Sequence, residues 1–470
     1  MTKRNLQHAT LLRRDLLMGF GGLGAAGILA ACGTVATAPA AQPEQAAEEE
    51  APAKTEEAPA PAERVTVSHY VALNARHLEL YPTLIEEPFE NDHPNIDLET
   101  ILREGPYYDK FNTLVAAGEP PDVIWLAQVE VFTQGHIIDV SPLIKRDNYD
   151  LSIYPQQLFR DGVMYGENVL GLPNQSGGNW PVMPYNKEIL ANAGVSDPPV
   201  EWGDPSWNAE TFLEALVKTT QREGENPLHF GIGNIGRGVI AANWGPFWGA
   251  RWVAEDFKTV VCDSPEMIDA IRYLTDLSSK HRVMPVPGEL NDTFGTGNTR
   301  NNFLNGKLAF LQTSGGGTFA IAQGVQEGKP FAYAPLPTFM HTASAQALDS
   351  NGLIGASKVQ DEGWELIKWH ATHPNWAIGR GNAPARLDHF EVWARELYGG
   401  DVAEKIRVEA YANSLANASR YDGLRVLPNW RNPIFDQIIT PALDALYRGQ
   451  GDVVETMNAL RQQIQAEIPE

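Results

Sequence analysis

Positive charge is in short supply in this chain, which has 36 Lys and Arg residues against 59 Asp and Glu, a formal net charge of −23. A surface of that sign repels the phosphates of nucleic acids and the head groups of anionic lipids. We therefore expect no nucleic-acid partner and no adsorption of the folded protein onto an anionic membrane. The same charge says little about a neutral small molecule.

Cysteine is scarcer still, with only Cys32 and Cys262 in 470 residues. Two cysteines cannot build the disulfide framework of a small secreted domain. Long apolar runs are also missing, because beyond the N-terminal segment no stretch reaches the ~18 residues expected of a membrane-spanning helix.

Catalytic and metal-binding motifs are absent as well. We find no H-E-x-x-H, no G-x-S-x-G, no paired cysteines and no EF-hand loop, so we predict no metal, no cofactor and no enzymatic activity. Gly19–Gly24 and Gly231–Gly236 match the spacing of a phosphate-binding loop, but neither stands between a strand and a helix. His370 and His373 are spaced by three at a helix end, and we interpret them as a surface feature.

What the chain does have begins at its N-terminus. Arg13 and Arg14 follow a basic start, an apolar run comes next, and Leu29–Cys32 reads Leu-Ala-Ala-Cys. This order predicts an export signal over residues 1–31, similar to a twin-arginine signal, with Cys32 as the lipid-modified residue of a lipobox. A transmembrane helix is the alternative, but the run spans about 16 residues and contains five glycines, short of the ~20 that a span requires.

A linker follows the predicted signal. Residues 32–63 begin with Cys32 and are rich in Ala, Pro and Glu, with no aromatic side chain to bury. We interpret them as a disordered tether that holds the folded part away from the membrane. Residues 64–470 are long enough for two lobes of ~200 residues each.

Strands and helices alternate along these residues, which predicts an α/β protein with mostly parallel sheets. Strands are predicted over Arg64–Val71, after the turn at His93–Ile96, and over Pro121–Leu126. Helices are predicted over the segments Leu78–Phe89, Tyr107–Ala117, Asn208–Arg222, Pro265–His281, Gly363–Thr372 and Phe390–Tyr398, and two more within Gln437–Ile468, split near Gly449 and Gly451.

Several of these segments carry landmarks whose order and spacing extend over most of residues 64–470. They are His93–Ile96, Tyr108–Phe111 with Ala116–Val123, Gly135–Leu143, Gly171–Pro173, Tyr185–Leu190 with Ala193–Val195, Ser206–Asn208, Phe303–Phe310 and Ala334–Pro337. Together they resemble the bacterial extracellular solute-binding proteins of the carbohydrate type, relatives of maltose-binding protein.

The resemblance implies two hinge-linked α/β lobes of the periplasmic-binding-protein type II fold, with a ligand cleft between them. One lobe would comprise residues 64–173 plus 338–385, and the other residues 174–337 plus 386–470. The protein would be an exported monomer, anchored by lipid at the outer face of the cytoplasmic membrane. It would capture a sugar or oligosaccharide by hinge closure and deliver it to an ABC permease.

Candidate ligand residues of the second lobe are mainly aromatic, because a flat ring can stack on the apolar face of a sugar. Trp244 and Trp248 stand in a Trp/Gly/Pro-rich loop that also supplies Arg251, and the resemblance adds Trp430. Ser314 and Gly316 lie where many relatives carry an aromatic residue. This chain has three glycines there instead, which would let the backbone approach the ligand closely.

Candidate residues of the first lobe and of the crossing between lobes are mostly polar. They are Tyr70 at the end of the first strand, Trp125 and Gln128 at and after the Pro121–Leu126 strand, and Asn174, Gln175 and Trp180 at the first crossing. For Trp125 and Tyr70, packing in the core is the competing interpretation. Asn351 and Arg386 are weaker candidates.

Three alternative functions remain open from the sequence. A receptor for a polyamine, a sugar phosphate or an osmolyte would share the fold. A secreted glycan-cleaving enzyme would need two carboxyl groups facing each other across the site. A lectin-like adhesin would bind sugar without an importer.

Overall fold

The computed structural model describes residues 64–176, 182–233, 244–254, 256, 258–313, 315–343, 346–418 and 430–468. The chain divides into two units, Met1–Ala60 and Pro61–Glu470, and every described residue belongs to the second. The predicted signal, Cys32 and the linker lie outside these ranges. In the part of the chain that is described, no helix is both long and apolar enough to cross a membrane.

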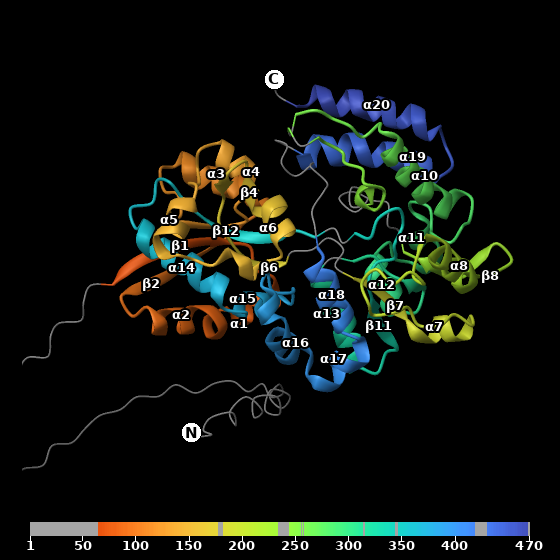
Figure 1. Cartoon of the computed structure of the whole chain (residues 1–470), viewed down its shortest axis with the longest axis horizontal. Coiled ribbons are helices and arrows are strands. Elements are labelled where there is room, and N and C mark those ends of the chain that lie inside the picture. The colour runs from red at the N-terminus through yellow and green to blue at the C-terminus, as the bar shows by residue number, and fades with distance from the viewer. Residues whose placement is uncertain are drawn as a thin grey trace, which may run out of the picture. The chain divides into compact units, whose positions relative to one another are not determined.

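A five-stranded mixed sheet forms the centre of what we call the first lobe (Figure 1). In the order in which they pair, its strands are β2 (Ile96–Leu102), β1 (Val65–Val71), β3 (Val123–Trp125), β12 (Leu348–Leu353) and β6 (Leu172–Ser176). β1 pairs in parallel with β2 and β3, whereas β12 runs antiparallel to β3 and β6. The three strands predicted from the sequence are confirmed, and β12 joins them from a distant part of the chain.

Helices cover both faces of this sheet (Figure 1). One face packs against α1 (Ala75–Tyr81), α2 (Glu87–Asp92), α14 (Gln360–Thr372) and α15 (Asn375–Arg380), and the other against α3 (Tyr107–Ala116), α4 (Val129–Thr133) and α6 (Gln156–Val163). α5 (Ser141–Asp147) and the hairpin of β4 (Met164–Tyr165) and β5 (Asn168–Val169) complete the first lobe. The helix predicted over Leu78–Phe89 is interrupted by a π-helical turn, Pro82–Glu86. This turn begins at Pro82, and proline lacks the backbone N–H that a regular helix uses for its hydrogen bonds.

The second lobe is built on another five-stranded sheet. In pairing order its strands are β11 (Phe331–Ala334), β7 (Met183–Asn186), β10 (Leu308–Phe310), β9 (Asn226–Ile232) and β8 (Gln221–Glu223). Its helices are α7 (Lys187–Asn192), α8 (Ala209–Thr219), α10 (Pro265–Ser279), α11 (Glu289–Phe294), α12 (Thr299–Leu304) and α13 (Gly315–Gln326). The side chain of Asn208 caps α8, as the predicted start requires. The helix ends at Thr219, short of the predicted Arg222, because β8 begins at Gln221.

The remaining helices fall into two groups. α16 (Phe390–Tyr398), α17 (Gly400–Ile406) and α18 (Glu409–Ala416) pack against α13, α15 and β11. A π-helical segment, Trp430–Ile439, leads into α19 (Thr440–Tyr447) and α20 (Val453–Ala466), which pack on α10. The two predicted C-terminal helices are confirmed, with their break at Gly449 and Gly451.

Three histidines lie in the core of the first lobe. His69 and His77 are fully buried, and His370 is 1% exposed. The His370 ring centroid lies 5.1 Å from that of His69 and 4.9 Å from that of Trp376. The expectation that His370 is a surface residue was therefore wrong. It follows Ile367 by three positions and so shares the helix face that packs on the sheet.

Candidate ligand-binding site

Several strand ends meet at one edge of the first sheet. β1 and β3 are parallel, and β6 runs in the same direction because both β3 and β6 are antiparallel to β12. The carboxyl ends of β1, β3 and β6 therefore lie at the same edge as the start of β12. In open α/β sheets, ligands bind outside the carboxyl ends of the strands. We call this region the first-lobe edge.

Trp125 and Asn351 lie side by side at this edge, because the strand register places them opposite each other on β3 and β12. Trp125 is 4% exposed and Asn351 is fully buried. The Asn351 Oδ1 atom lies 3.3 Å from the Nε2 atom of His69, whereas its Nδ2 atom has no partner. The Trp125 Nε1 atom is also buried without a partner.

Two more amides continue this pattern on β6. Asn174 is 4% exposed, and neither its Oδ1 nor its Nδ2 atom has a partner. The buried Gln175 donates from Nε2 to the Oδ2 atom of Asp349 at 2.5 Å, and its Oε1 atom has no partner. A buried polar group left unpaired costs about 1–3 kcal/mol. Several such groups at one edge are therefore expected where water or a ligand completes the hydrogen bonds.

A small hollow opens at the same edge of the sheet. Its lining includes Gln128, Asp161, Asp349 and Ser350, so it joins the loop after β3 to α6 and the start of β12. Gln128 stands at the N-cap of α4, but its side chain makes no capping hydrogen bond. The side chain is thus not committed to the helix.

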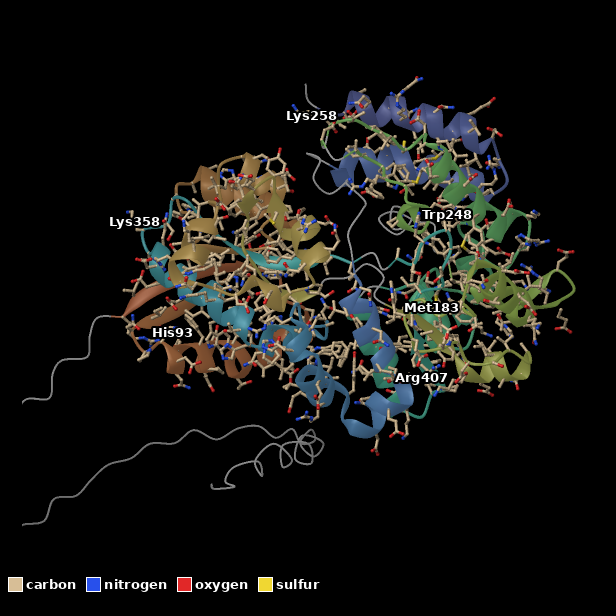
Figure 2. All side chains as sticks on the ribbon, in the orientation of Figure 1. His93, Met183, Trp248, Lys258, Lys358 and Arg407 are labelled. Carbon is tan, nitrogen blue, oxygen red and sulfur yellow. The ribbon has the colours of Figure 1, made fainter. Side chains whose placement is uncertain are left out.

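The second lobe carries an aromatic cluster, which we define as Trp244, Phe247, Trp248, Tyr273 and Phe339. The Trp248 ring centroid lies 5.0 Å from that of Phe339 and 5.5 Å from that of Tyr273. Trp244 is fully buried, and its Nε1 atom donates to Gln312 at 3.3 Å. Trp248 is partly exposed and lies on the second lobe (Figure 2). Of the two tryptophans, only Trp248 presents part of its ring to solvent.

Comparisons with known proteins agree with this architecture. Residues 74–375, more than half of the chain, match the family described as bacterial extracellular solute-binding protein. The chain belongs to this family. The resemblance stated from its sequence landmarks is thereby confirmed.

Solved structures of similar fold come from several bacteria. The solute-binding protein is similar to the ABC substrate-binding protein Lmo0181 from Listeria monocytogenes, solved in complex with cycloalternan, with 18% identity, 86% of this chain and 99% of that chain covered, and a TM-score of 0.68. The sugar-binding protein MalE from Xanthomonas citri is 17% identical, with 86% of this chain and 97% of that chain covered and a TM-score of 0.69. The GacH receptor of Streptomyces glaucescens, solved unliganded and with acarbose, is 18% identical, with 86% of this chain and 98% of that chain covered and a TM-score of 0.63. At these identities the likeness establishes the two-lobed fold.

The other sequence-predicted residues of this solute-binding protein fall in different surroundings. Tyr70 is fully buried and donates to the carbonyl of Tyr107 at 2.7 Å. Burial raises the pKa of Tyr70 to about 12. Arg251 is partly exposed, near the aromatic cluster in sequence. Trp430 begins the π-helical segment and Gly316 lies in α13, but their side chains are not described, and Trp180 and Ser314 lie outside the described residues.

Two residues at the first-lobe edge escaped the sequence-based prediction. Asp349 accepts the hydrogen bond of Gln175, and the Arg380 guanidinium lies 4.3 Å from the centroid of the Trp125 ring. Neither belongs to a motif, and both come from segments more than 170 residues away from their partners. Only the pairing of β12 and the packing of α15 bring them to the edge. Elsewhere in the described part of the chain, no cluster of three His, Cys, Asp or Glu side chains is arranged to hold a metal.

Proposed function

We propose that this protein is the substrate-binding receptor of an ABC importer and captures a sugar or oligosaccharide. The observation that carries the proposal is the set of buried, unpaired polar atoms on Trp125, Asn174, Gln175 and Asn351. Amides offer both donors and acceptors, as sugar hydroxyls do, and the indole adds a donor. Family membership and the cycloalternan and acarbose complexes of similar structures support this interpretation.

The proposed mechanism is binding without chemistry. The ligand would lie between the first-lobe edge and the second lobe, where Trp248, Arg251 and Trp430 are proposed contacts. Closure about the chain crossings near Pro173, Leu336 and Arg386 would bury it. We retain the proposed lobe boundaries of 64–173 plus 338–385 and 174–337 plus 386–470, except that the first crossing is moved to follow Ser176, the last residue of β6. The closed form would dock on the permease, since a ligand favours whichever conformation it binds more tightly.

A ligand screen by thermal shift on the full-length protein tests this proposal. A ligand present at 100 times its Kd adds about 2.7 kcal/mol of apparent stability. We expect a raised melting temperature with one sugar series and recovery of that sugar unchanged. A cleaved glycan would instead indicate an enzyme, and no response to any sugar would contradict the proposal.

One observation favours a second candidate, a receptor for a polyamine. Asp161 and Asp349 are the charged residues that line the hollow at the first-lobe edge, and both are acidic. Carboxylates attract an ammonium group. Putrescine and spermidine therefore belong in the same screen, and a response to them alone would favour this candidate.

We further propose that the protein is exported and held at the membrane by lipid on Cys32. The lipobox sequence Leu29–Cys32 supports attachment there. Cys32→Ala should move the protein from the membrane fraction to the soluble fraction of cells. Retention of that variant in membranes would contradict the lipid anchor and leave ligand binding untouched.

A further inference from the structure

Arg380 places a cation over the first-lobe edge. It is the last residue of α15, and its guanidinium carbon lies 4.3 Å from the centroid of the Trp125 ring. One nitrogen donates to the carbonyl of Ala72, just after β1, whereas the buried Nε atom has no partner. Among the described residues, no carboxylate forms an ion pair with Arg380. A partly buried charge without a counterion is costly.

Two unpaired donors accompany Arg380 at this edge. They are Nε1 of Trp125 and Nδ2 of Asn351, on residues that are 4% and 0% exposed. The acceptor atom of Asn351 already faces His69 at 3.3 Å. A hydroxyl both donates and accepts, but a carboxylate or phosphate oxygen only accepts. These two donors, next to a guanidinium, can therefore serve an anionic group.

Two further arginines strengthen the positive potential here. Arg103 directly follows β2, and its backbone N–H donates to the carbonyl of Val71 at 2.9 Å. Arg76 donates to the carbonyl of Gly379 at 2.6 Å, next to Arg380. Burial lowers the pKa of Arg380, and the Arg103 guanidinium acts in the same direction. Three arginines at one sheet edge contrast with the net charge of −23.

Asp349 opposes this potential, since its carboxylate raises the pKa of Arg380. However, its Oδ2 atom accepts from Gln175 at 2.5 Å. Gln175 therefore competes with the guanidinium for this carboxylate. The charge of Arg380 remains available to a ligand.

We propose that Arg380 determines specificity and that the receptor selects a sugar carrying an anionic group, either a carboxylate or a phosphate. The anionic group would engage the guanidinium, with the Trp125 and Asn351 donors beneath it. This inference rests on the proposed function as a sugar receptor, but it can fail while that function holds.

Calorimetry on the full-length protein tests the inference with four probes: maltotriose as the neutral trisaccharide, a galacturonate trisaccharide, a glucosamine trisaccharide and glucose 6-phosphate. We expect one of the two anionic probes to bind at least tenfold more tightly than maltotriose, and the pair separates carboxylate from phosphate. Binding should weaken as salt is raised. Arg380→Gln should remove the preference, and Arg380→Lys should retain part of it, because lysine keeps the charge but lacks the planar fork.

Arg395→Gln is the matched control, because Arg395 is exposed on α16 and forms an ion pair with Glu391 at 3.0 Å, away from the first-lobe edge. It should leave every affinity unchanged. If Arg380→Gln fails to fold, two measurements still test the inference. One is the preference of the wild-type protein, and the other is the Arg103→Gln variant, whose exposed side chain is replaced and which should bind the anionic probe about threefold more weakly. A wild-type protein that binds maltotriose or the glucosamine probe best overturns the inference and leaves the receptor function standing. Binding of no sugar of any charge overturns both.

Discussion

Trp125 at the first-lobe edge and Trp244 in the aromatic cluster are buried in different ways. At the first-lobe edge, Trp125 is buried with an unpaired Nε1 atom, beside amides that also carry unpaired atoms. In the aromatic cluster of the second lobe, Trp244 is just as buried, but its Nε1 atom donates to Gln312. Buried indole N–H groups usually find a partner. The difference indicates that the Trp244 indole is satisfied as packed, whereas the Trp125 indole at the first-lobe edge is left for something that binds.

Of the effects predicted here, lowering the pH should produce the largest difference in stability between the two lobes. Burial lowers the pKa of His69 to about 3 and that of His77 to about 2, and it holds the pKa of His370 well below 6.5. Between pH 6.5 and about 3 the unfolded chain therefore binds protons that the folded first lobe excludes, so stability falls as pH is lowered. Each histidine lowers the free energy of unfolding by about 1.4 kcal/mol for each pH unit below 6.5. The three histidines together lower it by about 4 kcal/mol per pH unit.

Hydrogen exchange measured from pH 7 to pH 5 checks this prediction. Peptides from β1 and α14 should lose protection before peptides from β10 and α10. His370→Phe should reduce the slope of stability against pH by about a third. Equal loss of protection in both lobes would contradict the prediction.

The aromatic cluster should respond to truncation as a core does. Trp244→Ala removes a fully buried indole that contacts Phe247 and Phe339, with ring centroids at 5.5 Å in each case. We expect a loss of about 3–5 kcal/mol in the free energy of unfolding. Urea unfolding followed by circular dichroism measures it, and a loss below about 1 kcal/mol would show that this ring is not part of the core.

A part of the fold could be predicted where its sequence signal is local, that is, where the signal lies within the segment itself. Local periodicity and caps located β1, α3, α10 and α16 to within a few residues, because those signals lie inside each segment. The pairing of Asn351 with Trp125 joins residues 226 positions apart, and no local pattern specifies it.

The candidate site shows the same limit. Gln128 was predicted because it follows a strand, and strand ends lie at a sheet edge; Asn174 was predicted because it lies at the first crossing between the lobes. Arg380 was missed because α15 alone does not reveal which strand it covers. The hydrogen-bonding state of a buried side chain is decided by its neighbours in space, so the contrast between Trp125 and Trp244 has no counterpart in composition.

Two buried asparagines sharpen the comparison further. Asn302 is 1% exposed and its Nδ2 atom donates to the carbonyls of Thr296 and Asn298, whereas the Asn174 amide has no partner. Asn302→Leu should cost about 1–3 kcal/mol of stability, because it strands two carbonyls. Asn174→Leu should leave stability unchanged or raise it by about 1 kcal/mol.

Ligand affinity should show the opposite order. Asn174→Leu should weaken sugar binding about tenfold, since about 1.4 kcal/mol of hydrogen bonding to the ligand is lost. Asn302→Leu should leave the affinity unchanged. Denaturant unfolding and calorimetry on both variants measure the two effects, and a stability loss in Asn174→Leu equal to that in Asn302→Leu would mean that Asn174 is structural.

Trp248 gives the smallest and most discriminating test, because it belongs to the aromatic cluster yet is partly exposed. As a stacking surface, its ring contributes contact area that Phe supplies in part and Ala does not. We expect Trp248→Ala to weaken sugar binding about tenfold and Trp248→Phe about threefold, both with smaller losses of stability than Trp244→Ala. Titration of each variant with the sugar found in the screen measures this. If Trp248→Ala reduces stability as much as Trp244→Ala and leaves affinity intact, the whole cluster is core, and sugar recognition lies with the polar first-lobe edge.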